Sequence, residues 1–135
     1  MLKQYRMSVI SRTRDDEKPL SEKQVNAVVS QSLPTEEYNN KEVLLIVPDA
    51  TRTAPVGQLF KAIYKQIGGS VSKLDVMIAL GTHPPMSEEA ICERLEISLV
   101  ERREEYAKVQ FHNHEWDNPD ALKEIGTIPA SEIAE

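Results

Sequence analysis

The chain has 135 residues, of which 40% are hydrophobic and 28% charged, and its formal net charge is −6. This length fits one domain of ordinary size, about 100–200 residues, and the basic residues are scattered among acids, which excludes a nucleic-acid partner that needs clustered Lys and Arg. No apolar stretch reaches the ~20 residues of a transmembrane helix, so we expect no membrane partner either.

The N-terminus and the cysteine content both predict a cytoplasmic protein. The first 18 residues carry charges among their apolar residues and lack the cleavage pattern of a secretory signal. Cys92 is the single cysteine, which excludes an internal disulfide framework and fits a reducing compartment. We interpret Cys92 as a small core or surface residue rather than a nucleophile.

The first half of the chain predicts a strand, a helix and a second strand. Residues 2–10 have the pattern of a strand, and residues 21–33 that of an amphipathic helix with Ser21 as its cap. Pro34 ends this helix. Val43–Val47 are five consecutive apolar residues, too few for a helix, which predicts a strand covered on both faces in a parallel sheet.

Two further helices and another buried strand follow. A helix begins at Pro55, repeats apolar residues on one face and ends at Gly68 and Gly69; that face comprises Val56, Leu59, Phe60, Ile63 and Ile67. "KLDVMIALGTH" predicts the strand, and "SEEAICERLEI" a helix capped by Ser87. We therefore predict one α/β domain over residues 1–135, with a parallel, three-layer, Rossmann-like sheet of about three strands flanked by helices.

The loops after the two central strands carry the side chains that could bind a ligand or take part in a reaction. They leave the same edge of a parallel sheet, where open α/β folds bind ligands. Asp49 and Arg52 lie on one loop and His83 on the other. Arg52 could hold a carboxylate or phosphate with two hydrogen bonds, Asp49 could accept the ring proton of a histidine, and His83 could take and return a proton.

A purely structural interpretation of these residues stays open. Asp49 could cap its turn, Arg52 could pair with Asp49, and His83 could be a loop residue held rigid by the two prolines that follow it. No GxGxxG, Walker-type, CxxC or HExxH motif favours one interpretation.

His112 and His114 are two positions apart, so on a strand they would share a face and could supply two metal ligands. The more ordinary alternative is a partly exposed strand end, with Trp116 beside it as a packing residue. We predict no metal site in this chain.

Two blocks, "PDATRTAP" and "ALGTHPPMSEEAI", stand in order with a helix between them, and "FHNHEWDNPDALKEIGT" follows. Over roughly residues 40 to 128 the sequence resembles the N-terminal domain of the nickel-pincer-dependent lactate racemases and their 2-hydroxyacid racemase or epimerase relatives. In that family a hydride passes from the α-carbon of a 2-hydroxy acid to the nickel-pincer nucleotide while a histidine takes the hydroxyl proton. A planar keto acid forms, and the hydride and the proton are then returned on the opposite face.

The resemblance implies a role for each candidate residue and also shows what is missing. It makes His83 one of two proton-transfer histidines, Arg52 the group that holds the substrate carboxylate, and Asp49 a supporting polar contact. The family's second catalytic histidine, the lysine that anchors the cofactor and the nickel ligand belong to a downstream Gly-rich segment, expected beyond Glu135. Pro84 departs from the polar or basic residue, often arginine, that the family places after the histidine.

We therefore expect an N-terminal half that supplies one wall of a racemase site for a small 2-hydroxy acid and that is inactive without its C-terminal domain. The alternatives are a non-catalytic α/β module that binds a small carboxylate or phosphate, and a truncated product with no activity of its own.

Overall fold

The computed structural model describes residues 10–13 and 18–133. The strand predicted over residues 2–10 lies outside this part except for Ile10, which belongs to no strand. The described elements are, in chain order, α1 (Glu22–Ser32), α2 (Thr35–Tyr38), β1 (Glu42–Pro48), α3 (Val56–Ile67), β2 (Lys73–Ala79), α4 (Glu88–Arg94), α5 (Leu99–Arg103), β3 (Gln110–Asn113), the short 3-10 helix η1 (Pro119–Ala121) and α6 (Ala130–Ile133).

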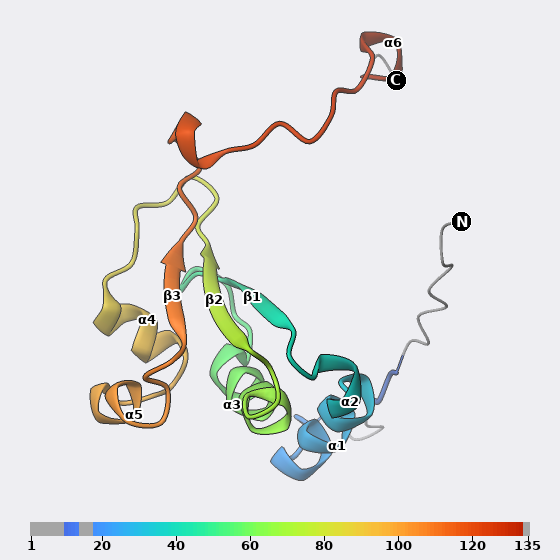
Figure 1. Cartoon of the computed structure of the whole chain (residues 1–135), viewed down its shortest axis with the longest axis vertical. Coiled ribbons are helices and arrows are strands. Elements are labelled where there is room, and N and C mark those ends of the chain that lie inside the picture. The colour runs from blue at the N-terminus through green and yellow to red at the C-terminus, as the bar shows by residue number, and fades with distance from the viewer. Residues whose placement is uncertain (1–9, 14–17, 134–135) are drawn as a thin grey trace.

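The three strands form one parallel sheet in the order β1-β2-β3, with helices packed beside it (Figure 1). β1 and β2 pair along their whole length, from Glu42 beside Lys73 to Pro48 beside Ala79. This confirms the predicted α/β class and the parallel direction of the two strands. The order follows from the two crossovers, each of which carries the chain through at least one helix before it returns to the sheet.

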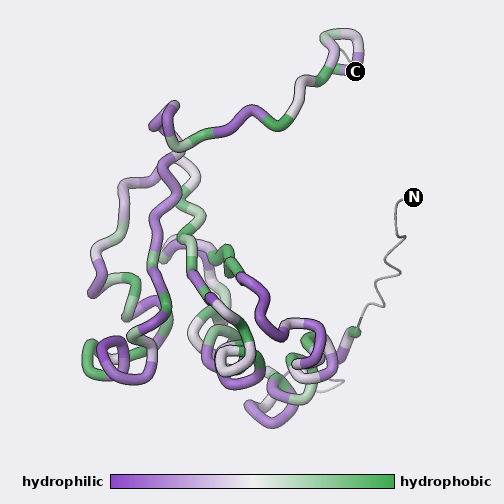
Figure 2. Tube along the Cα trace, in the orientation of Figure 1, coloured by the Kyte–Doolittle hydropathy of each residue, from purple (hydrophilic) through white to green (hydrophobic). Residues whose placement is uncertain are grey.

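The core lies on one face of the sheet. Alternate residues of the central strand, Leu74, Val76 and Ile78, are buried there together with Phe60 of α3 and Leu95 after α4. Figure 2 shows the matching alternation of hydrophobic and hydrophilic residues along the helices. α1 then packs against α3 in a second layer of contacts, a small cluster of Val25, Val29 and Ala62.

The prediction that Val43–Val47 is covered on both faces is wrong. β1 is an edge strand of the described sheet, and Leu44 and Ile46, which point away from the core, are 48% and 67% exposed. An unbroken apolar run does not tell which of its two faces is covered.

The face of the sheet that carries Leu44 and Ile46 is here called the open face. On this face Asp75 is buried, and its Oδ2 lies 2.7 Å from Lys73 Nζ and 3.1 Å from His112 Nε2.

The predicted helix ends are largely confirmed. Ser21 caps α1 in a capping box with Gln24, and the Ser87 hydroxyl accepts from the backbone N–H of Ala90 at the start of α4. Pro55 is the N-cap residue of α3, and Gly68 ends that helix. Leu59 departs from the predicted apolar face, because its side chain is 40% exposed.

Two other expectations concern cysteine chemistry and membranes. Cys92 is buried and free, and burial raises the pKa of its thiol, as befits a core residue. None of the helices in the described part of the chain combines the length and apolarity that a bilayer crossing requires.

After β3 the chain passes through η1 and extends away from the sheet to α6 (Figure 1).

Candidate functional site

The register of β1 and β2 brings the two candidate loops together. Pro48 pairs with Ala79, so the loops that follow the two strands begin side by side. One loop leads to α3 and carries Asp49 and Arg52, and the other leads to α4 and carries His83. All three side chains line one open cleft of about 620 Å³, here named the Arg52 cleft. The structure thus places the predicted site residues at one site.

Asp49 is the buried anchor of this site, with only 5% of its surface exposed. Its Oδ1 accepts from the Thr51 hydroxyl at 2.6 Å and from the Thr51 backbone N–H at 3.1 Å. The Thr51 hydroxyl and the His83 ring, which both favour the carboxylate, lower the pKa of Asp49 to about 2 against the opposing effect of burial. Asp49 is therefore ionised at neutral pH and can act only as an acceptor.

One ring nitrogen of His83 is held by that carboxylate, and the other makes no hydrogen bond with any residue that the structure describes. Nδ1 lies 2.5 Å from Asp49 Oδ2, and the carboxylate requires Nδ1 to carry the proton. The neutral ring then presents a lone pair at Nε2, and the side chain is 53% exposed. The loop itself is set by a turn in which the His83 N–H donates to Leu80 O, with Gly81 at a φ of 60°. A half-exposed, oriented imidazole is suited to proton transfer.

Arg52 is exposed, and among the described residues its guanidinium makes neither a hydrogen bond nor an ion pair. The Arg52–Asp49 pair of the structural interpretation is not formed, although Asp49 does cap its own turn through the Thr51 N–H. A free guanidinium beside an imidazole leaves five N–H donors for an anionic ligand.

Arg94 and Asn113 hold the two loops, and no sequence pattern marks either residue for this role. Arg94, at the end of α4, donates from Nε to Pro48 O at 3.2 Å and from its terminal nitrogen to Arg52 O at 2.8 Å. Asn113, at the end of β3, exchanges two 2.9 Å hydrogen bonds with the Met86 backbone. A single Arg at a helix C-terminus carries no sequence signal for this contact, because it reaches a loop more than 40 residues away.

The histidine pair does not form a metal site. His112 contacts Asp75 on the open face of the sheet, whereas His114, just past the end of β3, lines a different cleft beside Trp116. Within residues 10–13 and 18–133, no group of three or more His, Cys, Asp or Glu side chains is arranged to hold a metal ion. Trp116, expected to be a packing residue, is 41% exposed.

The residues present do not fit a covalently anchored nickel nucleotide. Among the described residues the Arg52 cleft is lined by no lysine that could anchor the nucleotide, and His83 is the one imidazole that lines it. No lysine anchor from the described residues is therefore found at this site.

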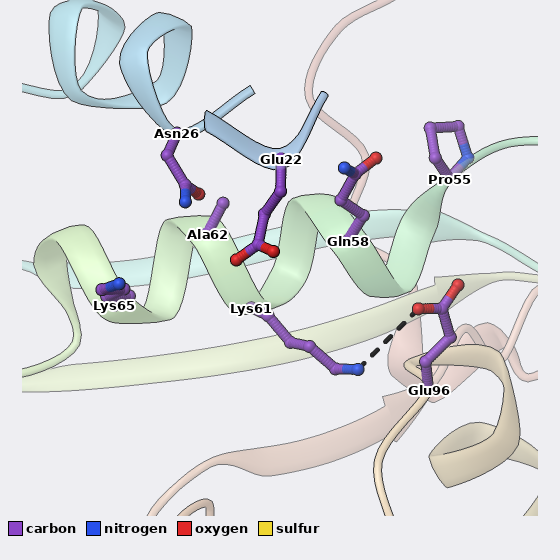
Figure 3. A pocket seen from close by; sticks show the side chains of 8 residues that line it. All are labelled: Glu22, Asn26, Pro55, Gln58, Lys61, Ala62, Lys65 and Glu96. Carbon is purple, nitrogen blue, oxygen red and sulfur yellow. Dashed lines mark ion pairs between the residues drawn. The ribbon is translucent and has the colours of Figure 1, made fainter. Parts of the chain in front are cut away.

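A further hollow between α1 and α3 has a different character (Figure 3). Its side chains are mostly polar, and Lys61 pairs with Glu96 at 3.7 Å. It combines no acid with a histidine and lies on the helical side of the molecule, so we do not regard it as the candidate site.

Fold and site together define a parallel α/β domain with an oriented histidine and a free arginine at the carboxyl edge of its sheet. The family model of the lactate racemase N-terminal domain matches residues 1–133, and the chain belongs to this family. No curated protein sequence matches the chain.

The fold is shared with a solved structure that has substantial sequence identity to this chain. The crystal structure of a protein from Thermotoga maritima, a structural genomics target, is 34% identical with a TM-score of 0.70. The match covers 84% of this chain and 26% of that protein, so the present chain spans about a quarter of its length.

Proposed function

We propose that this domain supplies the proton-transfer and carboxylate-binding wall of a 2-hydroxyacid racemase or epimerase. The observation that carries the proposal is the Asp49–His83 pair, with Nε2 of His83 free, in the same cleft as the unpaired Arg52 guanidinium. Membership of the lactate racemase N-terminal domain family supports the reaction class. The substrate and the activity are proposals for a whole protein, of which this domain is one part.

Each residue has a defined task in this proposal. Arg52 binds the substrate carboxylate, ideally through two parallel hydrogen bonds, and so fixes the α-carbon. His83 Nε2 takes the proton of the α-hydroxyl as the hydride leaves the α-carbon, which yields a planar keto acid. Asp49 fixes the tautomer of His83 and stabilises the imidazolium that results. Return of the hydride to the opposite face of the α-carbon and of a proton to the oxygen would give the other enantiomer.

The nickel-pincer nucleotide would supply the hydride acceptor in the whole protein. Because the Arg52 cleft offers no lysine to anchor it, and its one imidazole serves the substrate hydroxyl in this proposal, we derive no step through it from these residues. A C-terminal domain would have to provide its anchor and also the second proton-transfer group. We further propose that the protein acts in the cytoplasm and has neither nucleic acid nor membrane as a partner.

The proposal is tested by His83→Ala in the whole protein. We expect racemisation, followed by chiral chromatography, to fall by at least about 10²-fold, the usual contribution of a general base. His112→Ala is the matched control, because this histidine lies on the open face of the sheet and not in the Arg52 cleft. Activity that survives His83→Ala at the level of the control would refute the proposal.

The free Arg52 guanidinium also favours a second candidate, a non-catalytic module for small carboxylates or phosphates. This candidate predicts binding that Arg52→Ala abolishes, with no interconversion of enantiomers by the whole protein. Turnover that depends on His83 would rule it out.

A further inference from the structure

A second cleft, here named the Trp116 cleft, lies on the other side of His83 and has a volume of about 250 Å³. Three residues border both clefts: Leu80, Thr82 and His83. Pro84, Pro85 and Trp116 border the Trp116 cleft alone. His83 therefore borders both clefts, and a small molecule bound at this residue lies next to each of them.

The Trp116 cleft has walls that favour an apolar occupant. Pro84 and Pro85 have no backbone N–H to offer, and the indole of Trp116 presents a large aromatic surface that is 41% exposed. Two of the polar lining side chains are already engaged: the Asn113 amide with Met86, and Glu115 with the Asn118 amide at 2.6 Å.

Apart from Thr82 and His83, which border both clefts, the remaining polar lining consists of His114 and Asp117 and does not outweigh this. Neither side chain makes a hydrogen bond or an ion pair with another described residue, and none of the described residues that line the cleft is a Lys or Arg that would attract a second anionic group. A second carboxylate or a phosphate on the ligand would find no counter-charge here. An uncharged group, above all an aromatic ring, finds proline and indole surfaces to pack on.

We infer that the Trp116 cleft receives the third substituent of the 2-hydroxy acid, and that the preferred substrates carry a bulky apolar, above all aromatic, group there. This inference rests on the proposed function. With the carboxylate on Arg52 and the hydroxyl on His83 Nε2, the third substituent of the same α-carbon lies next to His83, which also borders the Trp116 cleft. The methyl group of lactate would leave most of the cleft unfilled.

The first experiment uses this chain and its single tryptophan. The probes are 3-phenyllactate and lactate, and the signals are the indole N–H of Trp116 and the ring C–H groups of His83 in NMR titrations. We expect both probes to shift His83 but only 3-phenyllactate to shift Trp116. Equal binding of both probes without a Trp116 shift would overturn the inference and leave the proposed function standing.

The second experiment measures specificity in the whole protein. We expect Trp116→Ala to lower kcat/KM for 3-phenyllactate about tenfold or more relative to lactate, as for other losses of apolar pocket contacts. Trp116→Phe, which keeps an aromatic face, should retain most of the preference. An unchanged ratio in Trp116→Ala would refute the inference, whereas absence of turnover of either acid by the unaltered protein would refute the proposed function as well.

Discussion

Arg94→Met is the sharpest test of how the site is held together. The Arg94 guanidinium bridges two carbonyls of the loop that carries Asp49, with hydrogen bonds of 3.2 Å to Pro48 and 2.8 Å to Arg52. Methionine keeps much of the apolar length of arginine but cannot donate. The substitution therefore removes the two hydrogen bonds while it changes packing little.

The cost follows from the surroundings of each hydrogen bond. The bond to Pro48 is partly buried and that to Arg52 is exposed. Hydrogen bonds to charged groups contribute about 1.5–3 kcal/mol when sheltered and less in water. We take about 1.5 kcal/mol for the first and about 0.5 kcal/mol for the second. The sum of about 2 kcal/mol corresponds to roughly a 30-fold change in the folded-to-unfolded ratio.

Urea denaturation of the chain at pH 7 measures this loss. Arg103→Met is the matched control, because Arg103 is exposed and makes no hydrogen bond or ion pair with other described residues. Arg94→Lys should recover about half of the loss, since one ammonium group cannot reproduce the forked geometry. A loss in Arg94→Met no larger than that of the Arg103→Met control would show that the bridge does not stabilise the loop.

Three further predictions concern neighbouring contacts. Thr51→Val should raise the pKa of Asp49 from about 2 toward its ordinary value of 3.8. The variant should therefore be less stable than the parent above pH 4, and this difference in stability should disappear near pH 2. An NMR titration of Asp49 and denaturation at each pH test this, and a stability difference that does not change with pH would contradict it. Asn113→Leu should lower the free energy of unfolding by about 1–3 kcal/mol, because the two hydrogen bonds to the Met86 backbone are lost. Hydrogen exchange at the Met86 N–H should become faster, and unchanged slow exchange in the variant would disprove this. Burial opposes ionisation of Asp75, but Lys73 and His112 outweigh burial and lower the pKa of Asp75. Asp75→Asn should therefore destabilise the chain at pH 7 and much less near pH 2. Equal losses of stability at both pH values would count against the ion pairs as the cause.

The sequence was informative where a local pattern determines structure. Ser21 and Ser87 mark helix starts through their own hydroxyl groups, and Gly68 marks a helix end, so these boundaries were predictable. The meeting of Asp49 with His83 also followed, because parallel strands bring their carboxyl-terminal loops to one edge.

Other features depend on contacts that no local pattern encodes. Ile46 looks like any residue of a fully buried strand, and its exposure depends on what covers the far face of the sheet. His112 and His114 have the spacing of a shared strand face, but the strand ends at Asn113 and the two side chains separate. The sequence predicts a packing role for Trp116, but β3 ends at Asn113 and the Trp116 side chain is 41% exposed.

The Arg94 bridge explains why two separate loops can behave as one site. α4 follows directly on the loop that carries His83, and its last residue holds the carbonyls on either side of Asp49. The position of one loop therefore constrains the other through two independent connections: the Asp49–His83 hydrogen bond at the cleft and the Arg94 bridge behind it. Proton transfer requires the imidazole to lie within hydrogen-bond reach of the substrate hydroxyl. Because the two connections tie the loops to the sheet and to α4, these rigid elements fix the position of the reacting nitrogen, His83 Nε2.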